Sequence, residues 1–135
     1  MGNYRHKVQY YETDQMGIVH HSNYIRWFEE ARTDMLERLG MGYDRMEQEG
    51  ILSPVLSVSC EYKTMTHFGD TVEVECSVVK YNGIRLELSY IVRDVLSGES
   101  RAEGTSRHCF LDREGKILSL KKASPFCHSL LEQCC

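Results

Sequence analysis

The clearest periodic segment of the chain runs from Asn23 to Leu39. Its apolar side chains recur at the spacing of one helical face, and they are Tyr24, Trp27, Phe28, Ala31, Met35 and Leu39. Ser22 or Asn23 can cap the start of a helix here, and Gly40 and Gly42 supply natural stops. The pattern therefore predicts one long amphipathic helix whose apolar face, including Trp27 and Phe28, belongs to the core.

The pattern changes on either side of this helix. Residues His6 to Tyr11 alternate weakly and favour a first strand, whereas Tyr43 to Glu49 favour a short helical segment that ends at Gly50. Beyond Gly50 the apolar residues recur every second position, which is typical of strands with one buried face. This period predicts four strands, at Val55–Tyr62, Thr71–Lys80, Arg85–Arg93 and Arg101–Leu111.

Turn formers separate the later strands at hairpin-like intervals. They are Asn82-Gly83, the segment Leu96–Glu99 and the segment Asp112–Gly115. An antiparallel meander is therefore the expected topology. Together with the single long helix, these strands predict an α+β fold in which an antiparallel sheet wraps around one helix.

Composition narrows the class of protein. A chain of 135 residues with 41% hydrophobic and 27% charged residues fits one globular domain, which we expect to span residues 1–135. We find no apolar run long enough for a transmembrane helix or a signal peptide, so we expect a cytoplasmic protein. The net charge of −4 argues against a nucleic-acid partner, because binding phosphates along a nucleic acid needs a basic face.

The six cysteines do not indicate a metal site. They are Cys60, Cys76, Cys109, Cys127, Cys134 and Cys135, without the CxxC pairs of a zinc site or the density of a disulfide scaffold. We expect free and mostly buried thiols. His20 and His21 are adjacent at the expected helix start, where we expect their side chains to point apart, and no third ligand follows at a standard spacing. No metal or other cofactor is therefore expected.

Asp14 lies in a segment of turn formers between the first expected strand and the long helix. The first turn of a helix has unpaired N–H groups and the positive end of the helix dipole, which can polarise a carbonyl. A carboxylate beside such groups can act as a nucleophile or as a general base. These features alone indicate a possible acyl-transfer or hydrolase site, and Asp14 could equally be a turn former.

The segment from Tyr10 to Arg32, YYETDQMGIVHHSNYIRWFEEAR, carries a denser signal. It resembles the signature of the 4-hydroxybenzoyl-CoA thioesterase family and its Tol-Pal-cluster relatives, roughly Y-x-x-T-D-x-x-G-V-V-x-H-x-x-Y-x-x-x-x-E-x-A-R. The similarity continues in CEYKTMTHFGDTVEV and GTSRHCFLD, and so covers most of the chain. Met65 stands where that family usually has proline, a departure that concerns a turn.

The resemblance implies a hotdog fold and hydrolysis of an acyl-CoA thioester in a dimer whose sites lie between subunits. Asp14 matches the family's catalytic carboxylate, which attacks the thioester carbonyl or activates a water. His21 matches the position at the helix start whose backbone N–H polarises that carbonyl. Tyr10 and Tyr24 match tyrosines that line the pocket, and Gly17, the glycine of the same signature, is expected to contact the substrate.

The substrate and its contacts stay open at this stage. We expect a short- to medium-chain or aromatic acyl-CoA, whose phosphates suit Lys or Arg side chains, and the candidates are Lys63, Arg85, Arg107, Lys121 and Lys122. The alternatives are a thioesterase acting on acyl carrier protein and a non-catalytic acyl-CoA-binding protein. A homodimer or homotetramer is expected, because a hotdog protomer exposes a sheet edge.

Overall fold

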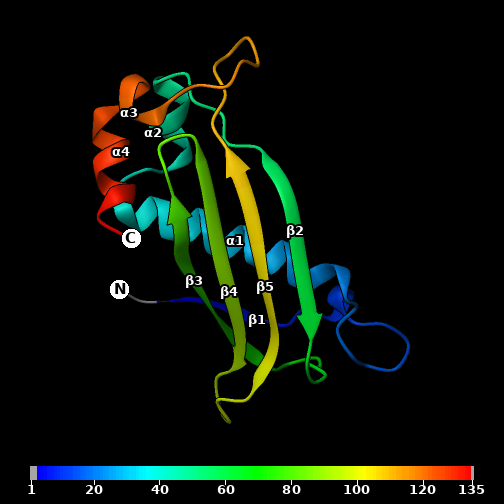
Figure 1. Ribbon diagram of the computed structural model, residues 1–135. Coiled ribbons are helices and arrows are strands. Elements are labelled where there is room, and N and C mark those ends of the chain that lie inside the picture. The colour runs from blue at the N-terminus through cyan, green and yellow to red at the C-terminus, as the bar shows by residue number, and fades with distance from the viewer. Residues whose placement is uncertain (1–2, 135) are drawn as a thin grey trace.

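A five-stranded antiparallel sheet and one long helix dominate the computed structural model, which describes residues 3–134. The strands lie in the order β1-β3-β4-β5-β2, and helix α1 (Ser22–Leu39) crosses one face of the sheet (Figure 1). The strand bounds are β1 (Tyr4–Lys7), β2 (Val55–Tyr62), β3 (Thr71–Tyr81), β4 (Arg85–Asp94) and β5 (Ser100–Cys109). This is the helix-on-sheet arrangement expected of a hotdog fold.

The core lies between α1 and the inner face of the sheet. The alternating residues of β3 and β4 are buried there as expected, and Trp27 and Phe28 of α1 pack onto them. Phe28 stacks on Tyr90 with ring centroids 4.4 Å apart. The helix approaches closely at Gly104 of β5, where a β-carbon would overlap the Phe28 ring and the Ser59 carbonyl. The interior beside this contact is therefore filled by aromatic side chains.

The first strand differs from the expectation. The expected strand His6–Tyr11 is wrong beyond Lys7, because β1 ends there and a 3-10 turn, η1 (Tyr10–Glu12), follows. The reason is local hydrogen bonding, since the Glu12 carboxylate turns back to accept from the N–H of Gln9 at 2.8 Å. The chain leaves the sheet at this point and enters the loop of Asp14.

The meander is confirmed only in part. β3, β4 and β5 are paired in succession, as the hairpin turns predicted. β2 does not join β3, whose edge is paired with β1, but lies at the opposite edge of the sheet beside β5. The connection from β2 to β3 therefore crosses the end of the sheet next to the N-terminus of α1, and this crossing helps to form a pocket.

The ends of the long helix and the positions of the short helices agree only in part with the expected start and stop signals. α1 ends at Leu39 and Gly40 follows as its C-cap residue with a φ of 96°, so the expected stop is confirmed. The predicted side-chain cap at Ser22 or Asn23 is wrong, because His21 is the N-cap residue and no side chain caps it. The short segment is confirmed as α2 (Tyr43–Gln48), whereas α3 (Leu120–Ala123) and α4 (Pro125–Glu132) were not predicted.

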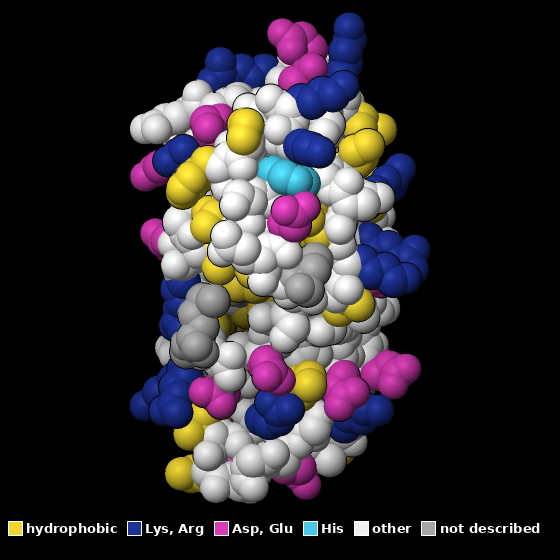
Figure 2. Space-filling model, turned by 60° about the vertical axis from the view of Figure 1, so that its left-hand side comes forward, with side chains coloured by type: hydrophobic (Ala, Val, Ile, Leu, Met, Phe, Trp, Pro, Cys, Tyr) yellow, Lys and Arg dark blue, Asp and Glu magenta, His cyan; other side chains and the backbone are white. Residues whose placement is uncertain are grey.

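The remaining sequence expectations concern thiols and the surface. Cys60, Cys76, Cys109 and Cys127 are free thiols. Cys109 and Cys127 are buried and Cys60, Cys76 and Cys134 are half-buried, while Cys135 lies outside the described residues. Within residues 3–134, no helix has the length and apolar character needed to cross a membrane. Figure 2 presents a face on which Lys and Arg side chains are interspersed with Asp and Glu side chains.

Candidate active site

A pocket of about 730 Å³ opens where the Asp14 loop, the N-terminus of α1 and the segment after β2 meet. Asp14, His21, Tyr24 and Lys63, which the sequence singled out, all line it. Their neighbours in the lining are mainly apolar and include Ile18, Val19, Tyr62 and Met65. The fold thus brings these four expected site residues together in one cavity.

The Asp14 loop is a tight reversal of the chain. The Asp14 N–H donates to the Ile18 carbonyl at 2.8 Å, and the Gly17 N–H donates to the Asp14 carbonyl at 3.0 Å. Gly17 has a φ of 77°, a left-handed conformation that glycine adopts without steric cost. One carboxylate oxygen of Asp14 accepts from the N–H of Met16 at 2.8 Å. Asp14 therefore does form a turn, and its exposed side chain also borders the pocket.

The buried carboxylate of Glu12 anchors the base of this loop. Glu12 is only 4% exposed. Its Oε1 accepts from His6 Nε2 at 2.7 Å and from the Gln9 N–H at 2.8 Å, and its Oε2 accepts from Trp27 Nε1 at 2.8 Å. Burial raises the pKa of Glu12, but the hydrogen bonds from Gln9, His6 and Trp27 outweigh burial, so the pKa lies below its ordinary value.

The backbone of Glu12 also fixes the start of α1. Its carbonyl accepts from the His20 N–H and from Asn23 Nδ2, both at 2.9 Å. The loop of Asp14 and the helix N-terminus are thus tied to the same peptide group. Sequence reasoning missed Glu12, because a single acidic residue in a polar segment carries no periodic signal.

The helix N-terminus presents His21 to the pocket. The His21 carbonyl accepts from Tyr62 Oη at 3.2 Å, and we find no acceptor for the His21 N–H among the residues that the structure describes. Such an N–H at a helix start can bind a developing negative charge on a carbonyl oxygen. The pocket therefore places a carboxylate and a helix N-terminus along one cavity.

Tyr24 forms a rigid part of the lining. It is buried, its hydroxyl donates to Thr66 Oγ1 at 3.0 Å, and its ring meets that of Tyr62 edge-on with centroids 5.2 Å apart. Burial raises the pKa of Tyr24, so the phenol stays protonated at neutral pH. The side chain is suited to packing against a ligand and to holding Thr66.

The two adjacent histidines do not point apart as expected. The rings of His20 and His21 are tilted against each other with centroids 4.2 Å apart. His20 Nδ1 lies 2.9 Å from Ser22 Oγ, which draws the His20 ring back over the helix start. In the stretch 3–134, no three His, Cys, Asp or Glu side chains cluster in a way that would hold a metal ion.

Six of the expected site residues do not line the pocket, namely Tyr10, Gly17, Arg85, Arg107, Lys121 and Lys122. Tyr10 is 78% exposed, is not part of the lining, and packs edge-on against Phe68. Arg85 and Arg107 line a different pocket of about 400 Å³. Arg107 follows Arg101 of the Asp14 pocket by six positions along β5, which corresponds to roughly 20 Å. In one protomer, the structure therefore does not bring Arg85 and Arg107 to Asp14.

The pocket also contains residues for which the sequence predicted no role. His67 and Arg101 reach it from the crossing segment and from β5. Tyr62 belonged to a recognised motif but carried no predicted role. The connection between β2 and β3 could have indicated them. Because β2 lies at the far edge of the sheet, this connection must cross the end of the sheet beside the pocket.

Comparisons with known proteins agree with this structure. Residues 8–134 match the family described as the thioesterase-like superfamily. The Bacillus subtilis protein named "Putative acyl-CoA thioesterase YneP" is 39% identical over 128 residues, which cover 94% of this chain and 92% of the relative. The Escherichia coli acyl-CoA thioester hydrolase YbgC is 28% identical over 80 residues, 59% of this chain and 60% of the relative.

Solved structures give the same result for the fold. A DHNA-CoA thioesterase from Staphylococcus aureus superimposes with a TM-score of 0.92 at 31% identity, covering 98% of this chain and 89% of the other. A hypothetical protein from Aquifex aeolicus superimposes with a TM-score of 0.86 at 38% identity, covering 95% and 97%. The expected α+β hotdog fold and the expected class of thioester hydrolase are thereby confirmed, and the chain belongs to the thioesterase-like superfamily.

Proposed function

We propose that this protein hydrolyses the thioester of an acyl-CoA, with Asp14 as the catalytic carboxylate. The observation that carries the proposal is the joint position of Asp14 and the N-terminus of α1 at His21 along one cavity. The names of the relatives support CoA thioesters as the substrate class, since YbgC is an acyl-CoA thioester hydrolase and the staphylococcal structure is of a DHNA-CoA thioesterase.

The proposed reaction divides the work between these two groups. The Asp14 carboxylate attacks the thioester carbonyl, or removes a proton from a water that attacks it. The N–H of His21 stabilises the negative charge that develops on the carbonyl oxygen. The C–S bond then breaks, and CoA leaves as a thiolate that takes up a proton. Attack by Asp14 itself would form an anhydride that water hydrolyses in a second step.

The lining favours an acyl group that is short or aromatic. Tyr24 and Tyr62 form an edge-on pair that can pack against an apolar chain or a ring. Trp27 and Phe28 fill the core behind Tyr24, which leaves little space for a long chain between helix and sheet. Resemblance to the 4-hydroxybenzoyl-CoA and Tol-Pal branches favours the same two acyl classes.

The CoA moiety needs cationic contacts, and Lys63 is the candidate within the pocket. Its Nζ lies 3.3 Å from Glu61 Oε2 at an exposed position, so the ammonium group can exchange this weak ion pair for a phosphate. We retain Arg85 and Arg107 as candidates only through a second subunit. We propose a homodimer.

The test is release of free thiol from a panel of acyl-CoAs, from acetyl to palmitoyl together with benzoyl and 4-hydroxybenzoyl. Asp14→Asn should retain the fold and lower kcat by several orders of magnitude. Asp112→Asn is the matched control, because the Asp112 carboxylate also accepts turn N–H groups, from Glu114 and Lys116, and lies outside the pocket. Wild-type turnover in Asp14→Asn would refute the assigned mechanism. If the protein released acyl groups from acyl carrier protein and from no acyl-CoA, its substrate would be the acyl carrier protein thioester instead.

A further inference from the structure

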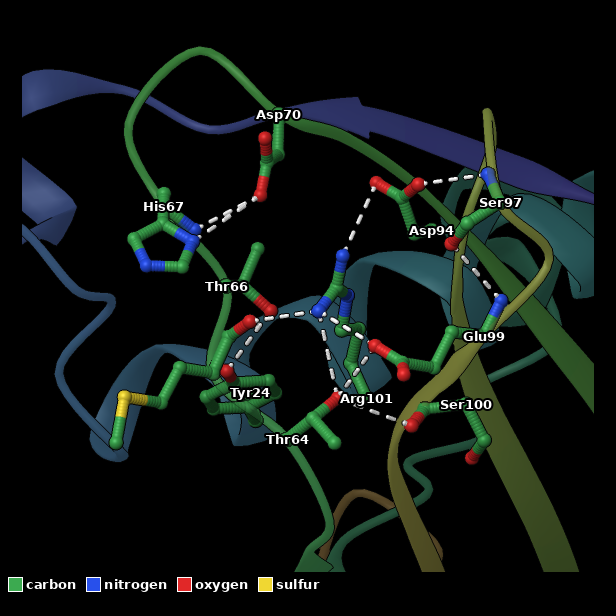
Figure 3. Close-up of polar contacts among 11 residues, drawn as sticks. Tyr24, Thr64, Thr66, His67, Asp70, Asp94, Ser97, Glu99, Ser100 and Arg101 are labelled. Atoms are coloured by element: carbon green, nitrogen blue, oxygen red, sulfur yellow. Dashed lines mark hydrogen bonds and ion pairs between the residues drawn. The ribbon is translucent and has the colours of Figure 1, made fainter.

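Arg101 of β5 supplies a largely buried guanidinium to the pocket that contains Asp14. Its side chain is 15% exposed. Nη1 donates to the Met65 carbonyl at 2.9 Å and to Glu99 Oε1 at 2.8 Å, and Nη2 lies 3.6 Å from Asp94 Oδ1. Figure 3 shows this guanidinium between the crossing segment and the turn that precedes β5.

The surroundings of Arg101 fit a structural anchor better than a ligand for a substrate anion. Two carboxylates, those of Asp94 and Glu99, offset its charge. Both are held in turn, because Asp94 Oδ2 accepts from the Ser97 N–H at 2.8 Å and Glu99 Oε1 accepts from Thr64 Oγ1 at 3.1 Å. These hydrogen bonds and ion pairs therefore hold the guanidinium in one position.

The segment that Arg101 holds is the pocket wall, residues Lys63–His67. The Arg101 carbonyl accepts from the N–H groups of Lys63 at 2.9 Å and Thr64 at 3.2 Å. The Met65 carbonyl accepts from Nη1, so the main chain at Arg101 holds the first two wall residues and its side chain holds the third. Lys63, Thr64 and Met65 all line the cavity, so their position defines its shape.

The far side of the pocket wall contacts the catalytic elements. The Thr66 carbonyl accepts from the Val19 N–H at 2.8 Å, and Thr66 Oγ1 accepts from the Tyr24 hydroxyl at 3.0 Å. Ile18, next to Val19, accepts from the Asp14 N–H at 2.8 Å. A short series of hydrogen bonds thus joins the wall to the backbone of Asp14.

The pocket wall contains no strand, apart from a single bridge between Ile18 and His67, and the Met65 side chain is exposed. Its support away from Arg101 includes the His67 N–H, which donates to Asp70 Oδ2 at 2.9 Å, and the buried Thr66. Arg101 Nε is the one buried side-chain polar atom without a hydrogen-bond partner within the described residues. An unsatisfied buried N–H is unfavourable, and such costs are typical of functional sites rather than of positions selected for stability alone.

We propose that Arg101 is a positioning residue of the thioesterase site, which sets the pocket wall and, through Thr66 and Val19, the loop of Asp14. The inference rests on the proposed function. It predicts that a change at Arg101 alters both substrate binding and turnover, because the wall lines the cavity and also supports the loop. A purely structural role would lower only the amount of folded enzyme, and KM would stay unchanged.

The kinetic test compares Arg101→Met and Arg101→Lys with the control Arg93→Met. Arg93 of β4 forms an ion pair with Glu75 of β3 at 3.2 Å, at a more exposed position than Arg101, and does not line the pocket. We expect Arg101→Met to lower kcat/KM by about tenfold or more with a raised KM, since small displacements at a site have large effects on rate. Arg101→Lys should recover part of the loss, and Arg93→Met should match wild type. Unchanged kcat and KM in Arg101→Met would overturn the proposal.

Amide hydrogen exchange tests the same idea without any substrate. In Arg101→Met, the amide of Val19, which donates to the Thr66 carbonyl of the wall, should exchange at least about tenfold faster, whereas the core amide of Val74 should not change. Equal acceleration at Val74 would indicate global destabilisation and refute a positioning role. If wild type hydrolyses no thioester, the proposed function fails, and exchange still decides whether Arg101 holds the wall and the loop.

Discussion

Trp27 Nε1 donates a hydrogen bond of 2.8 Å to the buried Oε2 of Glu12, so the central helix is tied to the base of the Asp14 loop. We expect Glu12→Gln to lower the free energy of unfolding by about 3 kcal/mol. The amide oxygen can accept at only one side of the former carboxylate, and the amide NH₂ then faces a donor. Urea denaturation monitored by far-UV circular dichroism measures this change, also in variants that lack Trp27.

The control for this pair is Trp27→Phe, which removes the indole N–H and keeps an aromatic ring in the core. Combined with Glu12→Gln it forms a double-mutant cycle. We expect a coupling energy of about 1 kcal/mol or more, because the two groups contact each other directly. Additive effects would mean that the hydrogen bond contributes nothing to the fold.

Acid should destabilise the protein through His108, which is buried in the core. Arg32 Nη1 lies 3.0 Å from His108 Nδ1, and Ser106 Oγ lies 2.7 Å from Nε2. Burial first, and then the Arg32 charge, lower the pKa of His108 from 6.5 to about 4. The unfolded chain therefore binds a proton that the folded chain excludes, and stability is lost as the pH falls from 6.5 through 4.

This loss can reach about 3 kcal/mol, the value of a shift of this size in pKa. Measurements of unfolding free energy between pH 4 and 7 should show the slope in wild type. His108→Gln should flatten it, because the amide can accept from Arg32 and donate to Ser106 without titrating. An identical slope in this variant would assign the acid sensitivity to other groups.

The contact between Gly104 and Phe28 should tolerate no side chain. A β-carbon at Gly104 would overlap the Phe28 ring and the Ser59 carbonyl, so we expect Gly104→Ala to destabilise the protein by about 3 kcal/mol. Gly42→Ala is the control, since its β-carbon would meet Glu37 Cγ at an ordinary 3.5 Å. Thermal unfolding should separate the two variants clearly. Similar melting temperatures would show that the helix can shift away from β5.

The sequence predicted those features that repeat along the chain. Helical and alternating periods located α1 and strands β2 to β5 to within two residues, because burial of one face imposes those periods. The position of β2 beside β5 depends on contacts distant in sequence, which no local pattern encodes. The helix α4 was missed although Pro125 stands at its first turn and Ser124 accepts from the Cys127 N–H, both ordinary start signals.

The candidate site likewise contains residues that the sequence predicted and residues that it did not. Asp14, His21 and Tyr24 were found because they lie close together in one motif. Glu12 was missed, although it lies inside that motif, because its importance comes from burial against His6 and Trp27. Arg101 reaches the pocket only through the pairing of β5 with β2, so no spacing along the chain could reveal it.

The exposed edge of β2 should pair with a second copy of the chain. Val55, Leu56, Val58 and Tyr62 are between 40% and 49% exposed, on a strand whose neighbour within the sheet is β5 alone. An apolar edge strand of this length favours association with another strand. Light scattering after size exclusion should therefore give at least a dimer at micromolar concentration.

Val58→Lys tests this edge, because the added charge would lie within the expected interface and should yield monomers. Val79→Lys is the matched control, since Val79 is 49% exposed on β3, away from that edge, and should leave the assembly intact. If the site lies between subunits, the Val58→Lys monomer should also lose thioesterase activity while retaining its fold. A monomeric wild type would refute the dimer, and a fully active Val58→Lys monomer would place the complete site in one chain.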